Sequence, residues 1–248
     1  MRIAFINPNT TEAFTRRVQE TLDRYASPQT QAVACNPSAG PRSIECVYDE
    51  LLSAAPTLEC ALACLPDCDA LVIACFSDHP TVQALREITD KPVIGIAEAS
   101  LYFACLLGQQ FSIVTTDEAW EPLLWQAVRH FGLAERCASV RSTRLPVLAL
   151  ETASPEETYQ IILKTARLAL AADGAEVICL GCAGMSGLDK RLEADLQVPV
   201  IDGVVAALKL MEGLVGYQVH TSKQRTYLPP RRKELLNLPV GFNAPYRD

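Results

Sequence analysis

Two cysteines occupy equivalent places in a repeated sequence pattern. Cys75 ends the apolar segment Asp69-Ala-Leu-Val-Ile-Ala-Cys75, and Cys182 ends the similar segment Glu176-Val-Ile-Cys-Leu-Gly-Cys182, 107 residues later. Each is followed by a turn whose backbone N–H groups can stabilise a thiolate. A thiolate is a competent base and a thiol a competent acid, so the pair suits proton transfer on opposite faces of one ligand. We take Cys75 and Cys182 as the candidate catalytic residues.

The repetition extends beyond the two cysteines. Pro92-Val-Ile-Gly95 matches Pro199-Val-Ile-Asp202 at the same spacing, and Phe5-Ile-Asn-Pro8 matches Ile113-Val-Thr-Thr116 at a spacing of 108 residues. A single match between apolar segments is easily produced by chance. Three matches in the same order at nearly one spacing favour a duplicated α/β unit.

Hydrophobic periodicity predicts strands that alternate with helices. The predicted strands are Arg2–Asn7, Gln31–Cys35, Ala70–Cys75, Val93–Ile96, Phe111–Thr115, a strand within Arg141–Leu148, Val177–Leu180 and Val198–Ile201. The predicted helices are 10–25, 48–65, 81–88, 119–131, 155–172, 188–196 and 204–214. Such alternation gives parallel sheets with helices on both faces.

The duplication predicts an α/β fold with two pseudo-symmetric Rossmann-like domains, each a parallel sheet flanked by helices. We assign residues 1–95 plus 204–228 to the first domain, 96–203 to the second and 229–248 to a C-terminal tail. Ligands of open parallel sheets bind beyond the carboxyl ends of the strands. The site is therefore expected in the cleft between the domains, with Cys75 and Cys182 on its opposite sides.

Composition and charge narrow the classes of partner. The 248-residue chain has a net charge of -7, which disfavours binding to nucleic acid or to an anionic membrane surface. The first apolar run is too short for a signal peptide, and no apolar stretch is long enough to cross a bilayer. We expect a cytoplasmic protein whose ten cysteines are mostly reduced thiols.

Other residues that suggest chemistry have simpler interpretations. Cys179 lies within an apolar strand, so its CxxC spacing to Cys182 does not predict a redox pair. Cys60, Cys64 and Cys68 fall near one helix face, where we expect packing or half-exposed thiols. No second ligand pair has a spacing that predicts zinc, and no glycine-rich motif predicts a nucleotide cofactor.

Several motifs resemble a known family, and they run in order from the N-terminus to about Pro230. They are Ile6-Asn-Pro-Asn-Thr10, Gly40-Pro-Arg-Ser-Ile-Glu45, Tyr48-Asp-Glu50, Ala74-Cys75-Phe-Ser-Asp78, Gly95-Ile-Ala-Glu-Ala99, Phe111-Ser-Ile-Val-Thr-Thr116, Leu180-Gly-Cys-Ala-Gly-Met185, Pro199-Val-Ile-Asp-Gly203, Thr221-Ser-Lys223 and Tyr227. With these motifs the sequence resembles the hydantoin and allantoin racemase branch of the aspartate/glutamate racemase superfamily.

The resemblance implies a cofactor-independent, two-cysteine racemase of a small cyclic ureide, either a 5-substituted hydantoin or allantoin. One thiolate would take the proton from the stereogenic carbon, and the other cysteine would return a proton on the opposite face, without pyridoxal phosphate or a metal. It also implies a homo-oligomer. The residues expected to bind the substrate are Pro8, Asn9, Ser77, Asp78, Thr115, Thr116, Gly181, Ala183 and Gly184.

The residues beside the cysteines bear on the substrate. Amino-acid racemases of the superfamily follow the cysteines with polar pairs such as Asn-Thr or Thr-His, whereas Phe76 and Ala183-Gly184 here suit a neutral ring. The family usually has Gly and then Asp-Pro-Gly after Cys-Phe, and this chain has Ser77-Asp78-His79-Pro80 instead. Asp78 either accepts a ring N–H or caps a turn, and His79 is expected in a surface turn.

Two further readings remain open. The chain can be another enzyme of the superfamily, such as an amino-acid racemase or a cis-trans isomerase. It can also be a non-catalytic protein that binds a small molecule, because a fold does not fix a function.

Overall fold

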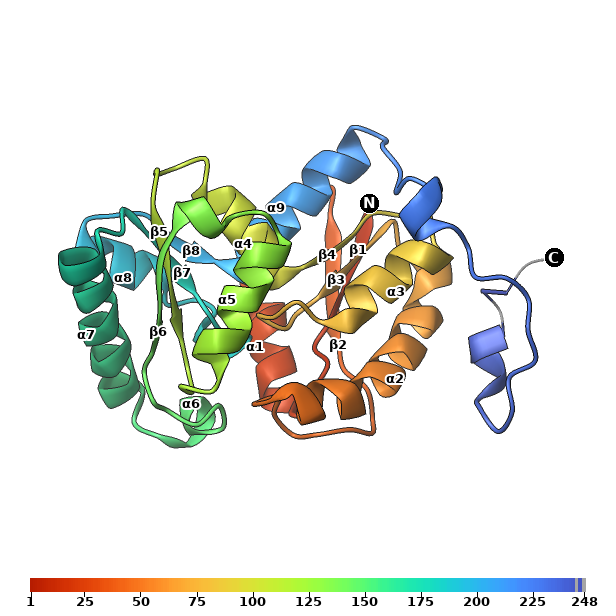
Figure 1. Cartoon of the computed structure of the whole chain (residues 1–248), viewed down its shortest axis with the longest axis horizontal. Helices are drawn as coiled ribbons and strands as arrows, with labels where there is room; N and C mark the ends of the chain where they lie inside the picture. Colours follow the sequence, from red (N-terminus) through yellow and green to blue (C-terminus); the bar gives the residue numbers. More distant parts are fainter. Residues whose placement is uncertain (244, 247–248) are drawn as a thin grey trace.

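Two four-stranded parallel sheets form the framework of the computed structural model, which describes residues 1–243, 245 and 246. The first sheet has the order β2-β1-β3-β4 and the second has the order β6-β5-β7-β8 (Figure 1). The strands are β1 (Arg2–Ile6), β2 (Gln31–Cys35), β3 (Ala70–Ile73), β4 (Val93–Gly95), β5 (Phe111–Thr115), β6 (Cys137–Ser142), β7 (Val177–Leu180) and β8 (Val200–Asp202). Each half places its strands in the same order, which confirms the predicted α/β fold class.

Parallel strands must be joined by crossover connections, and here helices form these connections and cover both sheets. They are α1 (Glu12–Tyr25), α2 (Val47–Cys64), α3 (Pro80–Ile88), α4 (Ile96–Ala104), α5 (Trp120–His130), α6 (Ala149–Thr152), α7 (Pro155–Asp173), α8 (Asp189–Leu196) and α9 (Gly203–Gly216). The short strands β3 and β7, which lie inside their sheets, are buried at every position. That burial explains why both read as continuous apolar runs.

The two sheets share one hydrophobic core. Phe5 and Val72 of the first sheet belong to the same cluster as Phe111 and Cys179 of the second. Helices α4 and α9, which follow the last strand of each sheet, pack against each other between the sheets. A Cβ at Gly203, the first residue of α9, would lie 2.8 Å from the carbonyl oxygen of Ile96, the first residue of α4. Glycine at this position therefore permits close contact between the two halves.

Three elements differ from the sequence prediction, and one of them is the short helix α6 (Ala149–Thr152), which was not predicted. The strand expected within Arg141–Leu148 begins earlier, because β6 spans Cys137–Ser142 and buries only Cys137 and Val140. An edge strand with so few buried positions gives a weak apolar signal. Helix α4 was not predicted, since six of its nine residues are buried and its apolar residues follow no single face.

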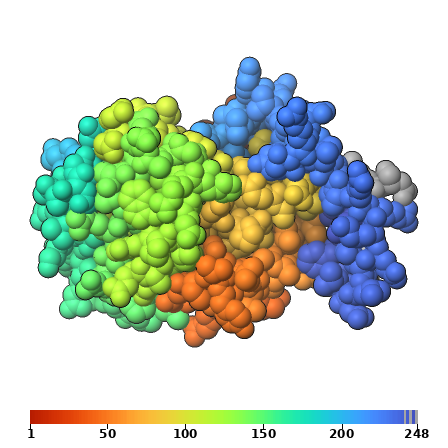
Figure 2. Space-filling model, in the orientation of Figure 1, coloured from red at the N-terminus to blue at the C-terminus, as the bar shows by residue number. Residues whose placement is uncertain are grey.

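The C-terminal tail lies on the outside of the first half, away from the second sheet (Figure 2). The chain reaches the tail through a short 3₁₀ turn at Arg225–Tyr227, where the Tyr227 hydroxyl donates to Oε1 of Gln83 at 2.9 Å. Among the residues that the structure describes, no helix is long and apolar enough to span a membrane.

Candidate active site

A cavity open to solvent lies where the carboxyl ends of the two sheets face each other, and about 470 Å³ of space lies between its walls when the part open to solvent is included. Its walls come from the loops after β1, β3, β5 and β7 and from four further positions in neighbouring segments. The lining residues are Asn7, Pro8, Asn9, Phe14, Ile44, Ala74, Cys75, Phe76, Thr116, Trp120, Val147, Gly181, Cys182, Ala183 and Gly184. The structure thus brings Cys75 and Cys182 into one cavity from equivalent loops of the two halves.

Cys75 lies two residues beyond the end of β3 and reaches the cavity with part of its surface. The Ser77 hydroxyl donates to its Sγ at 3.5 Å. Burial raises the pKa of the Cys75 thiol, and the nearby negative charge of Glu50 raises it further. Cys75 is therefore held as a neutral thiol.

Cys182 opens the 3₁₀ turn Ala183–Met185 directly after β7. The backbone N–H of Gly184 donates to its Sγ at 3.4 Å. Burial raises the pKa of the Cys182 thiol to about 11, while the Gly184 hydrogen bond and the positive charge of Arg17 oppose that rise. The predicted turn that stabilises a thiolate is thus present at Cys182, and this cysteine gives up its proton more readily than Cys75.

Two glycines shape the loop around Cys182. A Cβ at Gly181 would lie 2.8 Å from the carbonyl oxygen of Val114 and 2.9 Å from Cβ of Thr115. A Cβ at Gly184 would lie 2.7 Å from Cδ1 of Leu150. Both positions have no room for a side chain, so the sequence Gly-Cys-Ala-Gly lets the loop pack closely against β5 and α6.

The residues predicted to bind the substrate fall into two groups. The first group lines the cavity: Pro8, Asn9, Thr116, Gly181, Ala183 and Gly184. The second group lies outside its lining. Thr115 donates its hydroxyl to the carbonyl oxygen of Gly181 at 3.2 Å, and Ser77 contacts Cys75. The Asp78 carboxylate pairs with Nδ1 of His130 on α5. This pair links the two halves of the molecule and is not part of the cavity lining.

His79 lies in the interior, so the expectation of a surface turn is wrong. Its side chain is fully buried, with Nε2 2.9 Å from the Ser53 hydroxyl and Nδ1 2.8 Å from the Thr81 hydroxyl. Burial lowers the pKa of His79 to about 4, so the ring stays neutral. His79 caps the N-terminus of α3, and its partner Ser53 on α2 could not be predicted from any local pattern.

Sequence reasoning did not select several residues of the cavity wall. Phe14, Ile44, Trp120 and Val147 supply apolar surface from segments that lie far apart along the chain. Asn7 organises the first loop, where its Nδ2 donates to Oδ1 of Asn9 at 3.1 Å and to Oγ1 of Thr15 at 3.0 Å. The motif Ile6–Thr10 contains Asn7 and could have identified it as a site residue. The apolar wall could not be predicted, because its residues meet only in the tertiary fold.

Comparisons with known proteins agree with this geometry. The sequence model of the family described as Asp/Glu/Hydantoin racemase matches residues 3–211. A hydantoin racemase from Pseudomonas sp. (strain NS671) is 43% identical over 243 residues, which cover 98% of this chain and 97% of the relative.

Two solved structures share the whole architecture. The allantoin racemase from Klebsiella pneumoniae has a TM-score of 0.93 and 38% identity, and the match covers 99% of both chains. The allantoin racemase from Pseudomonas fluorescens has a TM-score of 0.91 and 38% identity, with 95% of this chain and 100% of that chain covered. The chain therefore belongs to the Asp/Glu/hydantoin racemase family of isomerases, in the branch that contains the hydantoin and allantoin racemases.

Proposed function

We propose that this enzyme racemises a small cyclic ureide, a 5-substituted hydantoin or allantoin, with Cys75 and Cys182 as its acid and base. One observation carries the proposal: two thiols from equivalent loops line the same cavity, where the other lining residues, among those described, carry no charged side chain. A ring of neutral amide groups needs no ion-pairing partner for its binding. The zwitterion of an amino acid has two charges and would need such partners.

The surroundings of the two thiols support different roles for them. Burial raises the pKa of both, but the positive charge of Arg17 opposes that rise at Cys182 and the negative charge of Glu50 adds to it at Cys75. We infer that both are thiols in the free enzyme at neutral pH and that Cys182 ionises first, so that it acts as base and Cys75 as acid. Turnover leaves Cys182 protonated and Cys75 ionised, and proton exchange with solvent restores the starting state or prepares the enzyme for the opposite enantiomer.

The carbanion formed at the ring carbon is stabilised as the enolate of the adjacent carbonyl, and the enolate oxygen needs a hydrogen-bond donor. Asn9 can supply one. Its Oδ1 already accepts bonds from Asn7 Nδ2 at 3.1 Å and from the Thr11 backbone N–H at 2.9 Å. These bonds orient the amide so that Nδ2 is the group left to donate to a ligand.

The apolar wall supports a substrate whose 5-substituent is carbon-rich. Phe14, Phe76 and Trp120 supply aromatic surface around the cysteines. Burying such a substituent gains about 25 cal/mol for each Å² removed from water. A hydantoin with an alkyl or aryl-methyl group would use this wall more fully than allantoin, whose ureido group is polar.

The test follows each enantiomer of allantoin and of 5-alkyl hydantoins by optical rotation, with proton NMR in deuterated solvent to detect exchange at the stereogenic carbon. We expect racemisation with deuterium uptake and without added cofactor. An enzyme that neither racemises nor exchanges any of these rings would favour a non-catalytic binding protein or another substrate class.

Single-cysteine variants separate the two bases. Cys75→Ser and Cys182→Ser should each lose racemisation in both directions. Each should still exchange the proton of one enantiomer, and the two variants should act on opposite enantiomers. Cys105→Ser, which changes a cysteine outside the cavity lining, is the matched control and should keep normal activity.

We also propose that the enzyme is a homo-oligomer, as its resemblance to the family implies. Light scattering coupled to size-exclusion chromatography would measure its mass in solution, and a monomer at micromolar concentration would contradict the proposal.

A further inference from the structure

Three cysteines outside the cavity lining form a compact group beside the first sheet. Cys35 is the last residue of β2, and Cys60 and Cys64 lie in the last two turns of α2. The Cys35 Sγ is 3.6 Å from both Cys60 Sγ and Cys64 Sγ, and all three sulfur atoms lie within 4.8 Å of one another. From the sequence, Cys60 and Cys64 were expected to share a helix face with Cys68. Cys35 was not predicted to join them, because it comes from a different element, the strand β2.

The sulfur spacing fits metal coordination. A tetrahedral zinc centre with Zn–S bonds of about 2.3 Å places its sulfur atoms about 3.8 Å apart. A disulfide brings two sulfurs to about 2.05 Å and cannot include the third. Sequence positions 60 and 64 are one helical turn apart, so both thiols face β2 from the same side of α2. Two of the three sulfur separations therefore match the edge of a coordination tetrahedron, and the third, between Cys60 and Cys64, is within 4.8 Å.

We propose that Cys35, Cys60 and Cys64 bind a thiophilic d¹⁰ cation such as Zn²⁺ as three thiolate ligands, with a solvent molecule in the fourth position. All three side chains are only partly buried, so the cation can enter from solvent. Thiolate is the ligand that soft and borderline metals prefer in proteins.

Coordination by thiolates couples metal binding to proton release. Zn²⁺ would displace the thiol protons of its ligands to solvent, so binding should strengthen as pH rises.

Cys68 is excluded as the fourth ligand by its own contacts. It lies beyond the end of α2, and its Sγ is directed to the carbonyl oxygen of Leu65 at 3.8 Å. The Lys91 ammonium group donates to the carbonyl oxygens of Leu65 and Cys68, at 2.7 and 2.6 Å, and holds this segment in place. The earlier placement of Cys68 on the helix face with Cys60 and Cys64 is therefore wrong.

The proposed site adjoins the loop of the cavity. The backbone carbonyl of Cys35 accepts the backbone N–H of Asn7 at 2.9 Å, and Asn7 lines the cavity. A cation that fixes the end of β2 to α2 would thus stabilise the strand that supports the Asn7–Asn9 loop. None of the three ligands lines the cavity, so the role of the site would be structural.

The experiment titrates reduced, metal-free enzyme with Zn²⁺ in competition with a chromophoric chelator, and with Cd²⁺ to record thiolate-to-metal charge-transfer absorption. The cavity thiols are first removed in the Cys75→Ser/Cys182→Ser background, because they can bind metal themselves. We expect one equivalent of metal in this background. Cys35→Ser and Cys64→Ser, added separately, should weaken binding by at least about 100-fold, more than the loss of an outer-shell contact.

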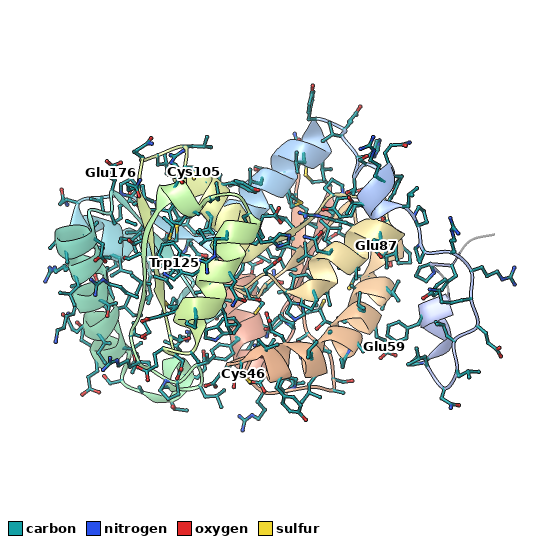
Figure 3. The ribbon with its side chains drawn as sticks, viewed as in Figure 1. Cys46, Glu59, Glu87, Cys105, Trp125 and Glu176 are labelled. Carbon is teal, nitrogen blue, oxygen red and sulfur yellow. The ribbon has the colours of Figure 1, made fainter. Side chains whose placement is uncertain are left out.

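Two variants control for the loss of any cysteine. Cys105→Ser alters a partly buried thiol at the end of α4 in the other half of the molecule, and Cys46→Ser alters an exposed thiol before α2 (Figure 3). Both should bind metal as tightly as the background. Circular dichroism of each metal-free variant checks that it is folded. Equal affinity in Cys35→Ser, or no bound metal in the background, would overturn the proposal.

Discussion

The Gly184 backbone N–H donates to the Cys182 Sγ at 3.4 Å, while the Cα of Gly184 faces the Leu150 side chain so closely that a Cβ would lie 2.7 Å from it. One residue therefore both stabilises the thiolate and packs the cavity loop against α6. Its two roles make the loop sensitive to the smallest substitution.

Gly184→Ala should lower kcat at least tenfold with little loss of stability, because its Cβ would press on the flexible Leu150 side chain and on Phe14, and the loop that holds the donor shares the resulting shift. A tenfold loss corresponds to about 1.4 kcal/mol of transition-state stabilisation. Steady-state racemisation rates measure this. An unchanged kcat would show that the Gly184 hydrogen bond does not tune Cys182.

Gly181→Ala should lower stability in addition to activity. Its Cβ would lie 2.8 Å from the Val114 backbone carbonyl oxygen, and backbone atoms cannot move aside as easily as a side chain. Overpacking of this kind costs about 1–3 kcal/mol. Urea unfolding measures the change. Gly213→Ala on α9 is the matched control, since a Cβ there meets nothing within 4 Å, and it should leave stability unchanged or raise it by up to about 1 kcal/mol.

Racemisation should rise with pH into the alkaline range. The base form of Cys182 forms as pH approaches its pKa of about 11, and the pKa of Cys75 is raised further by burial and Glu50. Activity requires one thiolate and one thiol, so it should fall again only when Cys75 also ionises. A profile of kcat/KM that peaks near neutrality would contradict this order of ionisation.

Glu50→Gln should move the alkaline, falling limb of that profile to lower pH. The carboxylate raises the pKa of Cys75 through its negative charge, and glutamine keeps the shape without the charge. The rising limb, which Cys182 sets, should stay in place. A Glu45→Gln control should shift the rising limb instead, because the charge of Glu45 raises the pKa of Cys182.

His79 should make the fold sensitive to acid. Its folded pKa of about 4 lies below the usual 6.5, so the stability it contributes is present above pH 6.5 and is lost as pH falls toward 4. The loss can reach about 3 kcal/mol, because one pKa unit corresponds to about 1.4 kcal/mol. Urea unfolding at pH 7 and pH 4.5 measures it.

His79→Asn keeps a helix-capping side chain but removes the titrating ring, so its stability should depend less on pH in this range. His220→Asn changes an exposed histidine and should retain the wild-type dependence. If His79→Asn loses stability on acidification as steeply as the wild type, another group is responsible.

The sequence predicted the repeated framework well, because the strands that support Cys75 and Cys182 are buried on both faces and read as uninterrupted apolar runs. It predicted β6 poorly, since an edge strand buries few residues, and it missed α4, which is buried too evenly to show a helical period. The burial of His79 and the meeting of Cys35 with Cys60 depend on tertiary contacts between segments, which no local pattern encodes.

The close approach of Gly203 to Ile96 has a consequence for the spacing of the two cysteines. The halves share one core, and their helices α4 and α9 approach each other nearly backbone to backbone. We therefore expect Cys75 and Cys182 to keep their relative positions when substrate enters, so that the distance between acid and base is set by the fold and not by the ligand.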